Sequence, residues 1–362
     1  MPYSVGFIGT GPDPEEKISG ESFAQAYSHA PGYAALDECE IVACADLVPE
    51  NAVAFADRFG IDDDRIYEDH AAMLTAVEPD VVSVCTPIPT HADLTLDCIR
   101  AGVDAVHCEK PMAVAYGDAR LVAQEAWRRG VQLSYHHQRR FGEPFRRARA
   151  LIDDGEIGPL RRLECSGAPI YETGIHFVDL CHYLAGETPV EWVVGAVDYR
   201  EENVRYGLHS ENQALAQWAY EDGVHGLAAT GHADAVGAAV RAEGTEGTIE
   251  VGGGGPTALR VRRGDGWEPL DVDGESVHGP GFDERAIADL IDALGTDREP
   301  ETGARRALAA TETIVAAYES ARRRGRVDLP LTVEDNPLVG MVESGALDPA
   351  PVDAGNDPES GG

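Results

Sequence analysis

The residues best suited to chemistry stand together at Glu109-Lys110-Pro111, directly after the apolar run Val103–Cys108. Proline donates no backbone hydrogen bond and disfavours a helix at the residue before it, so the acid and the base should leave the sheet together. Ligands bind open parallel sheets just beyond the carboxyl ends of the strands. Apart from Lys17, Lys110 is the only lysine in a chain that otherwise uses arginine. Its ammonium could stabilise negative charge on a reacting oxygen, and the plainer alternative is a solvated ion pair.

Two further patterns indicate nucleotide binding. The predicted strand Tyr3–Ile8 runs into Gly9-Thr10-Gly11, where glycine lets the backbone approach a pyrophosphate, although prolines follow in place of a third glycine. The predicted strand Glu40–Ala45 ends in Asp46. A carboxylate there accepts hydrogen bonds from both hydroxyls of an adenosine ribose and repels a 2′-phosphate, which favours NAD over NADP. The alternative is that Asp46 is the N-cap of the following helix.

These residues must be positioned by the first 135 residues, in which strands and helices alternate. Such alternation predicts a doubly wound parallel sheet. Thr90 is expected to cap a helix that ends at Gly102. The predicted strands are 3–8, 40–45, 66–67, 80–85, 103–108 and 131–135, and the predicted helices are 22–29, 49–59, 70–77, 91–100 and 116–129.

A different pattern follows a predicted helix at 143–153. Longer alternating runs indicate a mostly antiparallel sheet with one open face. Between them, a predicted helix at Ile175–Leu184 carries His176, Asp179 and His182, and amphipathic helices at 284–294 and 303–324 close the fold. The predicted strands are 161–166, 190–199, 213–220, 225–231, 238–243, 247–251 and 258–263.

We therefore expect an α/β plus α+β protein in three parts. Residues 1–135 form a Rossmann domain that binds NAD(P), and residues 136–330 form a mostly antiparallel, open-faced sheet domain for substrate binding and oligomerisation. Residues 331–362 are rich in Pro, Gly, Asp and Glu and are expected to form an acidic, flexible tail. The open sheet face predicts a homodimer or homotetramer.

The composition narrows the partner and the compartment. The 362 residues carry 64 acidic and 29 basic residues, a net charge of −35. This charge disfavours nucleic acid and anionic membranes as partners, and with scarce lysine it is typical of a halophile, with an acidic mesophile protein as the alternative. The N-terminus runs into a strand instead of a secretory signal, and no apolar run reaches the ~18–20 residues of a membrane span. Seven cysteines without a C-x-x-C motif indicate free thiols in a reducing cytoplasm.

Taken together, the motifs resemble the Gfo/Idh/MocA family, which includes glucose–fructose oxidoreductase, inositol dehydrogenase and rhizopine-catabolism proteins. The resemblance covers most of residues 3–330. It rests on Gly9-Thr10-Gly11, Cys85-Thr86-Pro87 with His91, Ala101-Gly102 ahead of Glu109-Lys110-Pro111, Arg140-Phe141, Gly155-Glu156-Ile157-Gly158 and Gly174-Ile175-His176-x-x-Asp179.

The resemblance implies a nicotinamide dinucleotide on the first domain and a sugar, polyol or related carbonyl compound against the second. It implies that Lys110 holds and polarises the reacting oxygen and that His176 transfers the proton. Glu172 stands where the family usually has aspartate, which leaves the role of this carboxylate open. The implied cofactor-binding residues are Gly9, Thr10, Gly11, Asp46, Thr86, Pro87, His91, Glu109, Lys110 and Arg140, the implied substrate-contacting residues are His137, Tyr171 and Asp179, and no metal site is expected.

The chemistry of these residue types agrees with that role. Hydride removal from a secondary alcohol requires the hydroxyl proton to leave, and histidine, with an ordinary pKa near ~6.5, can accept it. Two alternatives stay open at this point. One is a non-catalytic dinucleotide-dependent sensor, since a fold does not fix a function. The other is an NAD-dependent glycosidase or isomerase in which a transient oxidation leaves no net redox change.

Overall fold

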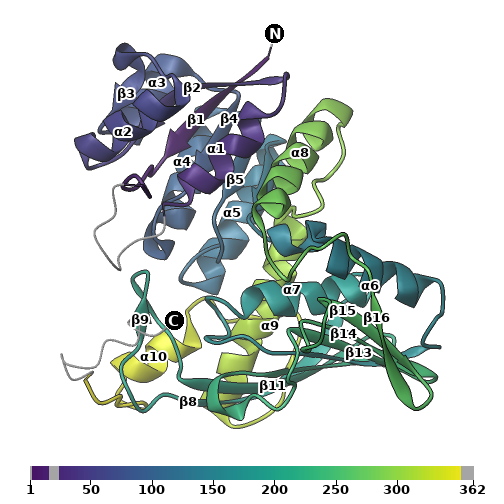
Figure 1. Cartoon of the computed structure of the whole chain (residues 1–362). Coiled ribbons are helices and arrows are strands. Elements are labelled where there is room, and N and C mark those ends of the chain that lie inside the picture. Colours follow the sequence, from purple (N-terminus) through teal and green to yellow (C-terminus); the bar gives the residue numbers. More distant parts are fainter. Residues whose placement is uncertain (1, 16–23, 352–362) are drawn as a thin grey trace.

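The computed structural model describes residues 2–15 and 24–351, which form two lobes (Figure 1). Pro12 and Pro14, which follow Gly11, lie within these ranges, whereas residues 16–20 of the predicted insertion, including Lys17, and the predicted helix start at Ser22 lie outside them. The first helix is observed at α1 (Ala26–Ala34) and continues past its predicted end at His29.

The first lobe is a six-stranded parallel sheet in the order β3-β2-β1-β4-β5-β6. This confirms the predicted Rossmann architecture. Its strands are β1 (Tyr3–Ile8), β2 (Cys39–Ala45), β3 (Ile66–Tyr67), β4 (Val81–Val84), β5 (Ala105–Cys108) and β6 (Gln132–Tyr135), and its helices after α1 are α2 (Pro49–Phe59), α3 (His70–Val77), α4 (His91–Ala101) and α5 (Tyr116–Arg129).

The strand order reverses at β1, so β1 and β4 are neighbours although β2 and β3 lie between them in sequence. A reversal of this kind opens a crevice at the carboxyl ends of the strands. Gly9 follows β1 at a φ of 81°, and a Cβ there would lie 2.4 Å from Cγ2 of Thr86, which follows β4. Only glycine fits this turn. Glu109 and Lys110 follow the next strand, β5, at the same edge.

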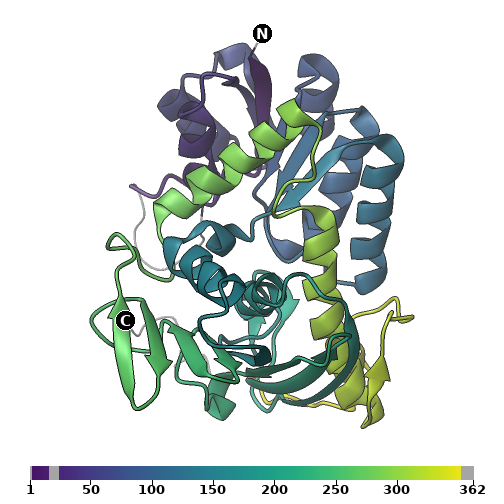
Figure 2. The same ribbon diagram turned by 90° about the vertical axis from the view of Figure 1, so that its right-hand side faces the viewer.

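The second lobe is a nine-stranded mixed sheet in which every neighbouring pair is antiparallel except β12 and β7. Helices α6 (Glu143–Asp153), α7 (Ile175–Leu184) and α9 (Ala304–Arg323) pack on one face of it (Figures 1 and 2). On the open face, Val194 and Leu215 are exposed. The strands, in sheet order, are β16 (Gly266–Leu270), β15 (Leu259–Arg263), β14 (Gly247–Val251), β13 (Val240–Gly244), β7 (Leu160–Cys165), β12 (His225–Ala229), β11 (Gln213–Tyr220), β8 (Val190–Asp198) and β17 (Val327–Asp328).

Two helices connect the lobes. Helix α8 (Pro280–Thr296) lies against α1, and Ile287 fits so closely over Gly32 that a Cβ there would be 2.7 Å from its Cδ1 (Figure 2). Helix α9 begins in the first lobe, where Ala304 joins the core of the sheet, and continues into the core of the second, where Ile314 is buried. The first lobe therefore includes, besides residues before 135, parts of α8 and α9 from much later in the chain.

The segment expected to be an irregular tail from residue 331 contains a helix. In α10 (Pro337–Glu343), the side chain of Asn336 accepts hydrogen bonds from the first backbone N–H groups, and Leu338 and Met341 are buried against the second lobe. The apolar contacts of this short helix offset its weak sequence pattern. Residues 352–362, the rest of the predicted tail, lie outside the described residues.

The cysteines and helices bear on two further expectations. All seven cysteines are free thiols, and five of them are buried. Within the described ranges, we find no helix with the length and apolar character needed to cross a bilayer.

Candidate active site

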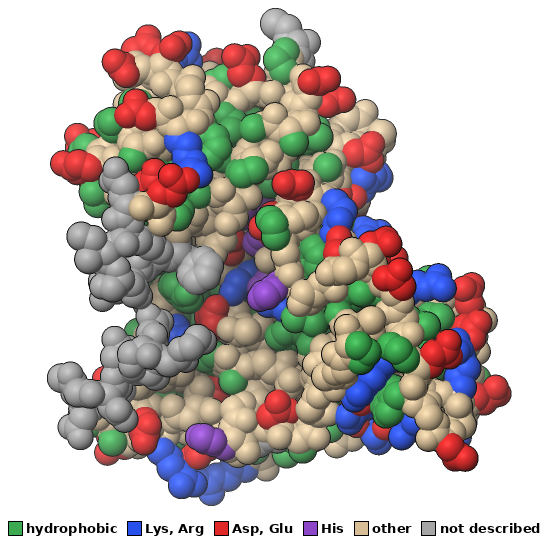
Figure 3. Space-filling view, viewed as in Figure 1, with side chains coloured by type: hydrophobic (Ala, Val, Ile, Leu, Met, Phe, Trp, Pro, Cys, Tyr) green, Lys and Arg blue, Asp and Glu red, His purple; other side chains and the backbone are tan. Residues whose placement is uncertain are grey.

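A cavity of about 930 Å³ lies between the lobes, at the carboxyl ends of β1, β4 and β5. This volume is at the upper end of the usual range for ligand sites, about 300–1,000 Å³. Figure 3 shows the hollow, in which basic and histidine side chains gather, while acidic side chains are scattered over the outer surface with basic ones among them. Of the predicted site residues, it is lined by Gly9, Gly11, Asp46, Thr86, Pro87, His91, Glu109, Lys110, Glu172 and His176.

Asp46 holds the glycine-rich turn at one end of the cavity. Its Oδ2 accepts hydrogen bonds from the backbone of Gly11 at 2.9 Å and from Oγ1 of Thr10 at 3.1 Å. Its Oδ1 accepts from the backbone of Val48, which is itself the N-cap of α2, so Asp46 does not occupy the cap position. Thr10 is fully buried and supports the turn from behind. A glycine turn at positive φ beside a carboxylate fits the pyrophosphate and ribose of a dinucleotide.

His91 connects the two loops that follow β4 and β5. Its Nδ1 lies 2.7 Å from the carbonyl of Pro111 and its Nε2 lies 2.7 Å from the carbonyl of Thr86. Burial lowers the pKa of His91 and outweighs the two carbonyls, which raise it; a neutral ring donates to one of these carbonyls, and the buried ring lies between the two loops. Thr90 occupies the N-cap position of α4 as predicted, but its side chain forms no capping hydrogen bond and instead contacts Thr86 Oγ1 and the carbonyl of Pro87, each at 2.8 Å.

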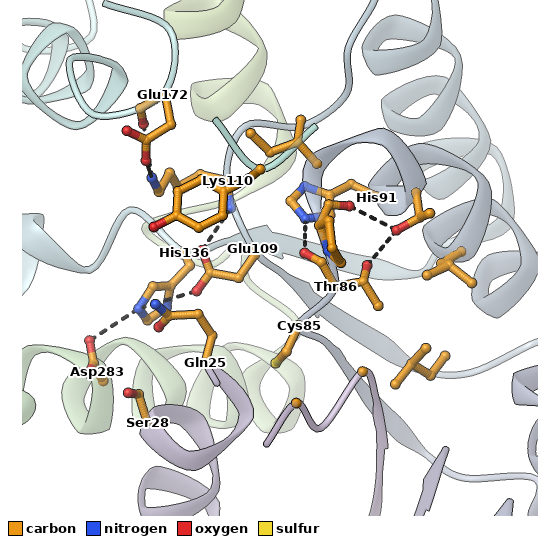
Figure 4. A pocket seen from close by; sticks show the side chains of 18 of the residues that line it. Gln25, Ser28, Cys85, Thr86, His91, Glu109, Lys110, His136, Glu172 and Asp283 are labelled. Atoms are coloured by element: carbon orange, nitrogen blue, oxygen red, sulfur yellow. Dashed lines mark hydrogen bonds and ion pairs between the residues drawn. The ribbon is translucent and has the colours of Figure 1, made fainter. Parts of the chain in front are cut away.

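Glu109 is buried among histidines, and Figure 4 shows it beside His136. Its Oε1 lies 3.1 Å from Nε2 of His29 and 4.0 Å from Nε2 of His136. His136 in turn bonds His107 and Asp283, each at 3.1 Å. Burial alone would raise the pKa of Glu109 and lower that of His29. The attraction of the histidines instead lowers the pKa of Glu109, and Cys85 and Glu109 raise that of His29 to about 10.

Ring nitrogens of His29, His107 and His136 all lie within 4.8 Å of one another. The sequence did not predict this cluster, because the three histidines come from α1, β5 and the end of β6. Both ring nitrogens of each of these histidines already have a hydrogen-bond partner among the described residues. The arrangement is therefore a closed polar network beside the cavity.

Lys110 extends from the end of β5 to Glu172 in the second lobe (Figure 4). Its Nζ donates to Oε1 and to the backbone carbonyl of Glu172, both at 2.9 Å. The other carboxylate oxygen accepts from Oγ1 of Thr173 at 2.5 Å. Burial would raise the pKa of Glu172, but Lys110 outweighs it and lowers this pKa. Glutamate in place of the expected aspartate thus directly contacts the lysine.

His176 stands in the first turn of α7 and lines the same cavity as Lys110. Burial, together with Lys110 and Arg139, lowers the pKa of His176 well below 6.5, so the ring is neutral. Its Nδ1 has no hydrogen-bond partner among the described residues. His137 lies beside it with ring centroids 5.8 Å apart and has its pKa lowered by burial to about 4. Neutral imidazole is the form that accepts a proton.

Five of the predicted residues, Thr10 among them, lie outside the cavity lining. Arg140 is fully buried and its guanidinium bonds both carboxylate oxygens of Asp179 at 2.7 Å, with Glu187 as a further partner. Tyr171 is buried and donates to the carbonyl of Ala113. Arg140, Asp179 and Tyr171 have hydrogen-bond partners within the fold, and their predicted roles stay predictions. His137 lies behind His176.

Several lining residues were missed by sequence reasoning. Arg139 precedes the predicted Arg140 and is the one that reaches the cavity. Arg205 lies on a two-residue strand, β9 (Val204–Arg205), which pairs with β10 (Leu208–His209) and is too short to give a sequence pattern. Asp283 and His278 come from the start of α8 and the loop before it, on the second lobe's return to the first.

Comparison with known families decides the relationship. The model of an oxidoreductase family with an NAD-binding Rossmann fold, GFO_IDH_MocA, matches residues 3–137, and that of its C-terminal α/β domain matches residues 151–329. The chain belongs to this family. It is thus an oxidoreductase with a nicotinamide-dinucleotide-binding domain, as the Gfo/Idh/MocA resemblance predicted.

Individual relatives agree along most of the chain. D-apiose dehydrogenase of Paraburkholderia graminis is 27% identical over 357 residues, which cover 90% of this chain and 92% of that protein. Inositol 2-dehydrogenase of Rhizobium meliloti is 27% identical over 271 residues, 66% of this chain and 76% of that protein. The WlbA dehydrogenase of Bordetella pertussis, solved with NADH and UDP-GlcNAcA, has a TM-score of 0.72 at 23% identity and covers 92% of this chain and 100% of that one. At this identity the structural likeness shows the fold.

Proposed function

We propose that the protein is an NAD-dependent dehydrogenase or reductase whose substrate is a sugar, a polyol or a related carbonyl compound. One observation carries the proposal. The Lys110 ammonium and the neutral ring of His176 line the same cavity as the glycine turn at Gly9 and the carboxylate of Asp46. A donor for an alkoxide, a proton acceptor and a dinucleotide site are the parts that hydride transfer at a CH–OH group requires.

The residues of the cavity have separate roles in the proposed hydride transfer. The bound nicotinamide supplies or accepts the hydride. Lys110 donates to the reacting oxygen and stabilises its developing negative charge, while Glu172 holds the ammonium in place at 2.9 Å. His176, kept neutral by burial and by nearby cations, accepts the hydroxyl proton in oxidation and returns it in reduction. The low-dielectric cavity strengthens both interactions.

Named relatives support the substrate class. The curated relatives include dehydrogenases of D-apiose, of D-glucosides and of inositol. All of these are polyhydroxylated compounds in which one CH–OH group is oxidised. Loops and side chains of the second lobe line the opposite side of the cavity, so they choose among such compounds.

Asp46 supports NAD over NADP. The two arginines that line the cavity, Arg139 and Arg205, both interact with Glu172 and so stand at the Lys110 end. Arg58, the nearby candidate for a phosphate contact, is paired with Asp13 and Glu15. A 2′-phosphate would therefore meet a carboxylate without a basic partner. Asp46→Asn should narrow the preference for NAD in kcat/KM, and a wild-type preference for NADP would overturn the assignment.

The test of the catalytic assignment is a substrate screen followed by two variants. Reduced-nicotinamide absorbance is followed over pentoses, hexoses, inositols and sugar acids in molar salt. Lys110→Ala and His176→Ala should each lower kcat by about 10²- to 10⁴-fold, the usual size of a lost charge-stabilising or acid–base contact, with less than additive effects together.

A control on the same helix separates catalysis from folding. His182 is buried on α7 but bonds Tyr220 and Thr313 outside the cavity. His182→Ala should lower stability while the folded fraction keeps its kcat. Wild-type turnover in either Lys110→Ala or His176→Ala would remove that residue from the mechanism. Dinucleotide binding without any absorbance change would favour the sensor, and product formation without net reduction would favour the isomerase or glycosidase.

A further inference from the structure

Two arginines in the cavity form no ion pair with a carboxylate of the described residues, unlike most other arginines of this acidic chain. Carboxylates outnumber basic residues 64 to 29. Arg140, one residue after Arg139, is fully paired with Asp179 and Glu187. By contrast, Arg139 and Arg205 form no direct ion pair with any carboxylate of the described residues, although both line the cavity beside Lys110.

Arg139 is held in a fixed position with donors unused. It lies in the 3₁₀-helix Gln138–Phe141, and its guanidinium stacks over the ring of Phe177 at 4.7 Å. Its Nη1 donates to the carbonyl of Val277 at 3.1 Å. Its Nε is buried and has no hydrogen-bond partner among the described residues. Burial lowers its pKa to about 10, so it remains charged at neutral pH. A buried cation without a direct ion pair is costly, which makes the position a candidate for binding an anionic ligand.

Arg205 reaches the cavity from the β9–β10 hairpin. Its Nε bonds Oδ1 of Asn203 at 3.3 Å, and its two terminal nitrogens have no partner among the described residues. The hairpin rests on the loop after β4, where a Cβ on Gly207 would lie 2.8 Å from Cγ of Pro89. This contact places a guanidinium of the second lobe over the carboxyl edge of the first.

The carboxylates near the two arginines form hydrogen bonds or ion pairs with other residues. Glu172 interacts with both arginines electrostatically, but its own oxygens contact Lys110 and Thr173. Glu109 is paired with His29 and Asp283 with His136. The Lys110 end of the cavity therefore holds three fixed cations and one directly neighbouring carboxylate that pairs with Lys110. A ligand with a negative charge would offset the excess positive charge at this end of the cavity.

We propose that Arg139 and Arg205 bind a carboxylate of the substrate, so that the protein acts on a sugar acid, an aldonic or uronic acid, in preference to a neutral sugar. This rests on the proposed function, because it names the substrate of the same site. The planar fork of a guanidinium matches the two oxygens of a carboxylate, and two such forks fix both the position and the orientation of the sugar. The CH–OH group to be oxidised is then held at Lys110 and His176.

The test compares acid and neutral substrates in single variants. Ratios of kcat/KM are measured for D-gluconate against D-glucitol and for D-glucuronate against D-glucose, in the wild type and in Arg139→Gln and Arg205→Gln. Each variant should reduce the preference for the acid by about 10- to 100-fold, the usual consequence of a lost hydrogen bond to a charged group. Arg147→Gln is the matched control: Arg147 is exposed, likewise outside any direct ion pair of the described residues, and not in the cavity lining. It should leave the ratio unchanged.

Binding is measured separately from turnover. Calorimetric titration of D-gluconate and D-glucuronate is carried out with NAD present, and titration of NADH is carried out alone. Loss of acid binding in both variants with unchanged NADH affinity supports the inference, even where no acid is turned over and the proposed function fails. Turnover of neutral sugars in preference to acids keeps the function but overturns the inference. A loss of NADH affinity in either variant would also overturn the inference, because it would assign the arginines to the diphosphate of the cofactor. A preference for sugar phosphates over sugar acids would overturn it as well.

Discussion

The buried pair of His29 and Glu109 allows a quantitative prediction. Their side chains are 0% and 7% exposed and their atoms approach to 3.1 Å. Cys85 and Glu109 together raise the pKa of His29 from 6.5 to about 10, so only part of this rise comes from the pair with Glu109. Breaking a buried ion pair by removing one partner costs about 3–5 kcal/mol. Glu109→Gln keeps the shape and removes the charge, so it should lower the free energy of unfolding by about 3–5 kcal/mol near pH 6.5.

The pH dependence follows from the direction of each change. His29 has its pKa raised on folding, so its contribution is complete below pH 6.5 and is lost as the pH rises through about 10. Glu109 has its pKa lowered, so its contribution is complete above pH 4.5 and is lost as the pH falls. The difference between wild type and Glu109→Gln should therefore be largest between pH 4.5 and 6.5 and shrink toward pH 10. Using this difference removes the effect of buried histidines that do not face Glu109, whereas His136, 4.0 Å from Oε1 of Glu109, contributes to it.

The assay is urea unfolding followed by fluorescence at constant salt, at pH 6.5 and pH 10. Asp97→Asn is the matched control. Asp97 pairs with His70 at the same 3.1 Å, but the side chains are 46% and 26% exposed, so the loss should stay below about 1 kcal/mol. A double-mutant cycle with His29→Gln should show a coupling of comparable size. A loss below 1 kcal/mol at pH 6.5 in Glu109→Gln, or one that does not shrink at pH 10, would refute the reasoning.

Three further predictions concern rate, salt and assembly. Because burial, Lys110 and Arg139 lower the pKa of His176, kcat for oxidation should stay constant from pH 8 down to 6.5 and fall only below it; a fall already above pH 6.5 would count against His176 as the base. A net charge of −35 predicts that the melting temperature rises between 0.1 M and 1 M salt, as the screening length shortens from ~10 Å to ~3 Å; an unchanged value would contradict the halophilic interpretation. Light scattering in molar salt should show a dimer or tetramer, and Leu215→Glu, a residue 48% exposed on the open sheet face, should weaken it; a wild-type monomer would rule this interface out.

The sequence predicts nearly all elements of the first lobe, because the patterns that mark them lie within short stretches of the chain. Buried parallel strands give short apolar runs, and residues directly after them must meet at one edge. That argument placed Gly9, Asp46, Thr86 and Lys110 around one cavity, and the structure has all four in its lining. The second lobe's helix carrying His176 was also predicted with its observed bounds, because its apolar spacing is regular.

Sequence reasoning did not reveal contacts whose partner comes from elsewhere in the chain. Arg140 and Asp179 form a buried ion pair over 39 residues of sequence, and no spacing rule predicts such a pair. The histidine network behind Glu109 draws on three separate elements for the same reason. Arg205 was missed because a two-residue strand has no periodicity. Distant pairing, rather than weak propensity, set the limit of prediction for the site.

The two helices that join the lobes also decide when the protein can fold as it is made. Residues of α8 and the first turn of α9, at Ile287, Ala304 and Ala307, complete the core around the N-terminal sheet. That core therefore stays open on the ribosome until more than 300 residues have been synthesised. A chimera that exchanged residues 1–135 between relatives would separate α1 from the helix that covers Gly32. Any working exchange must transfer residues 280–307 together with the N-terminal sheet.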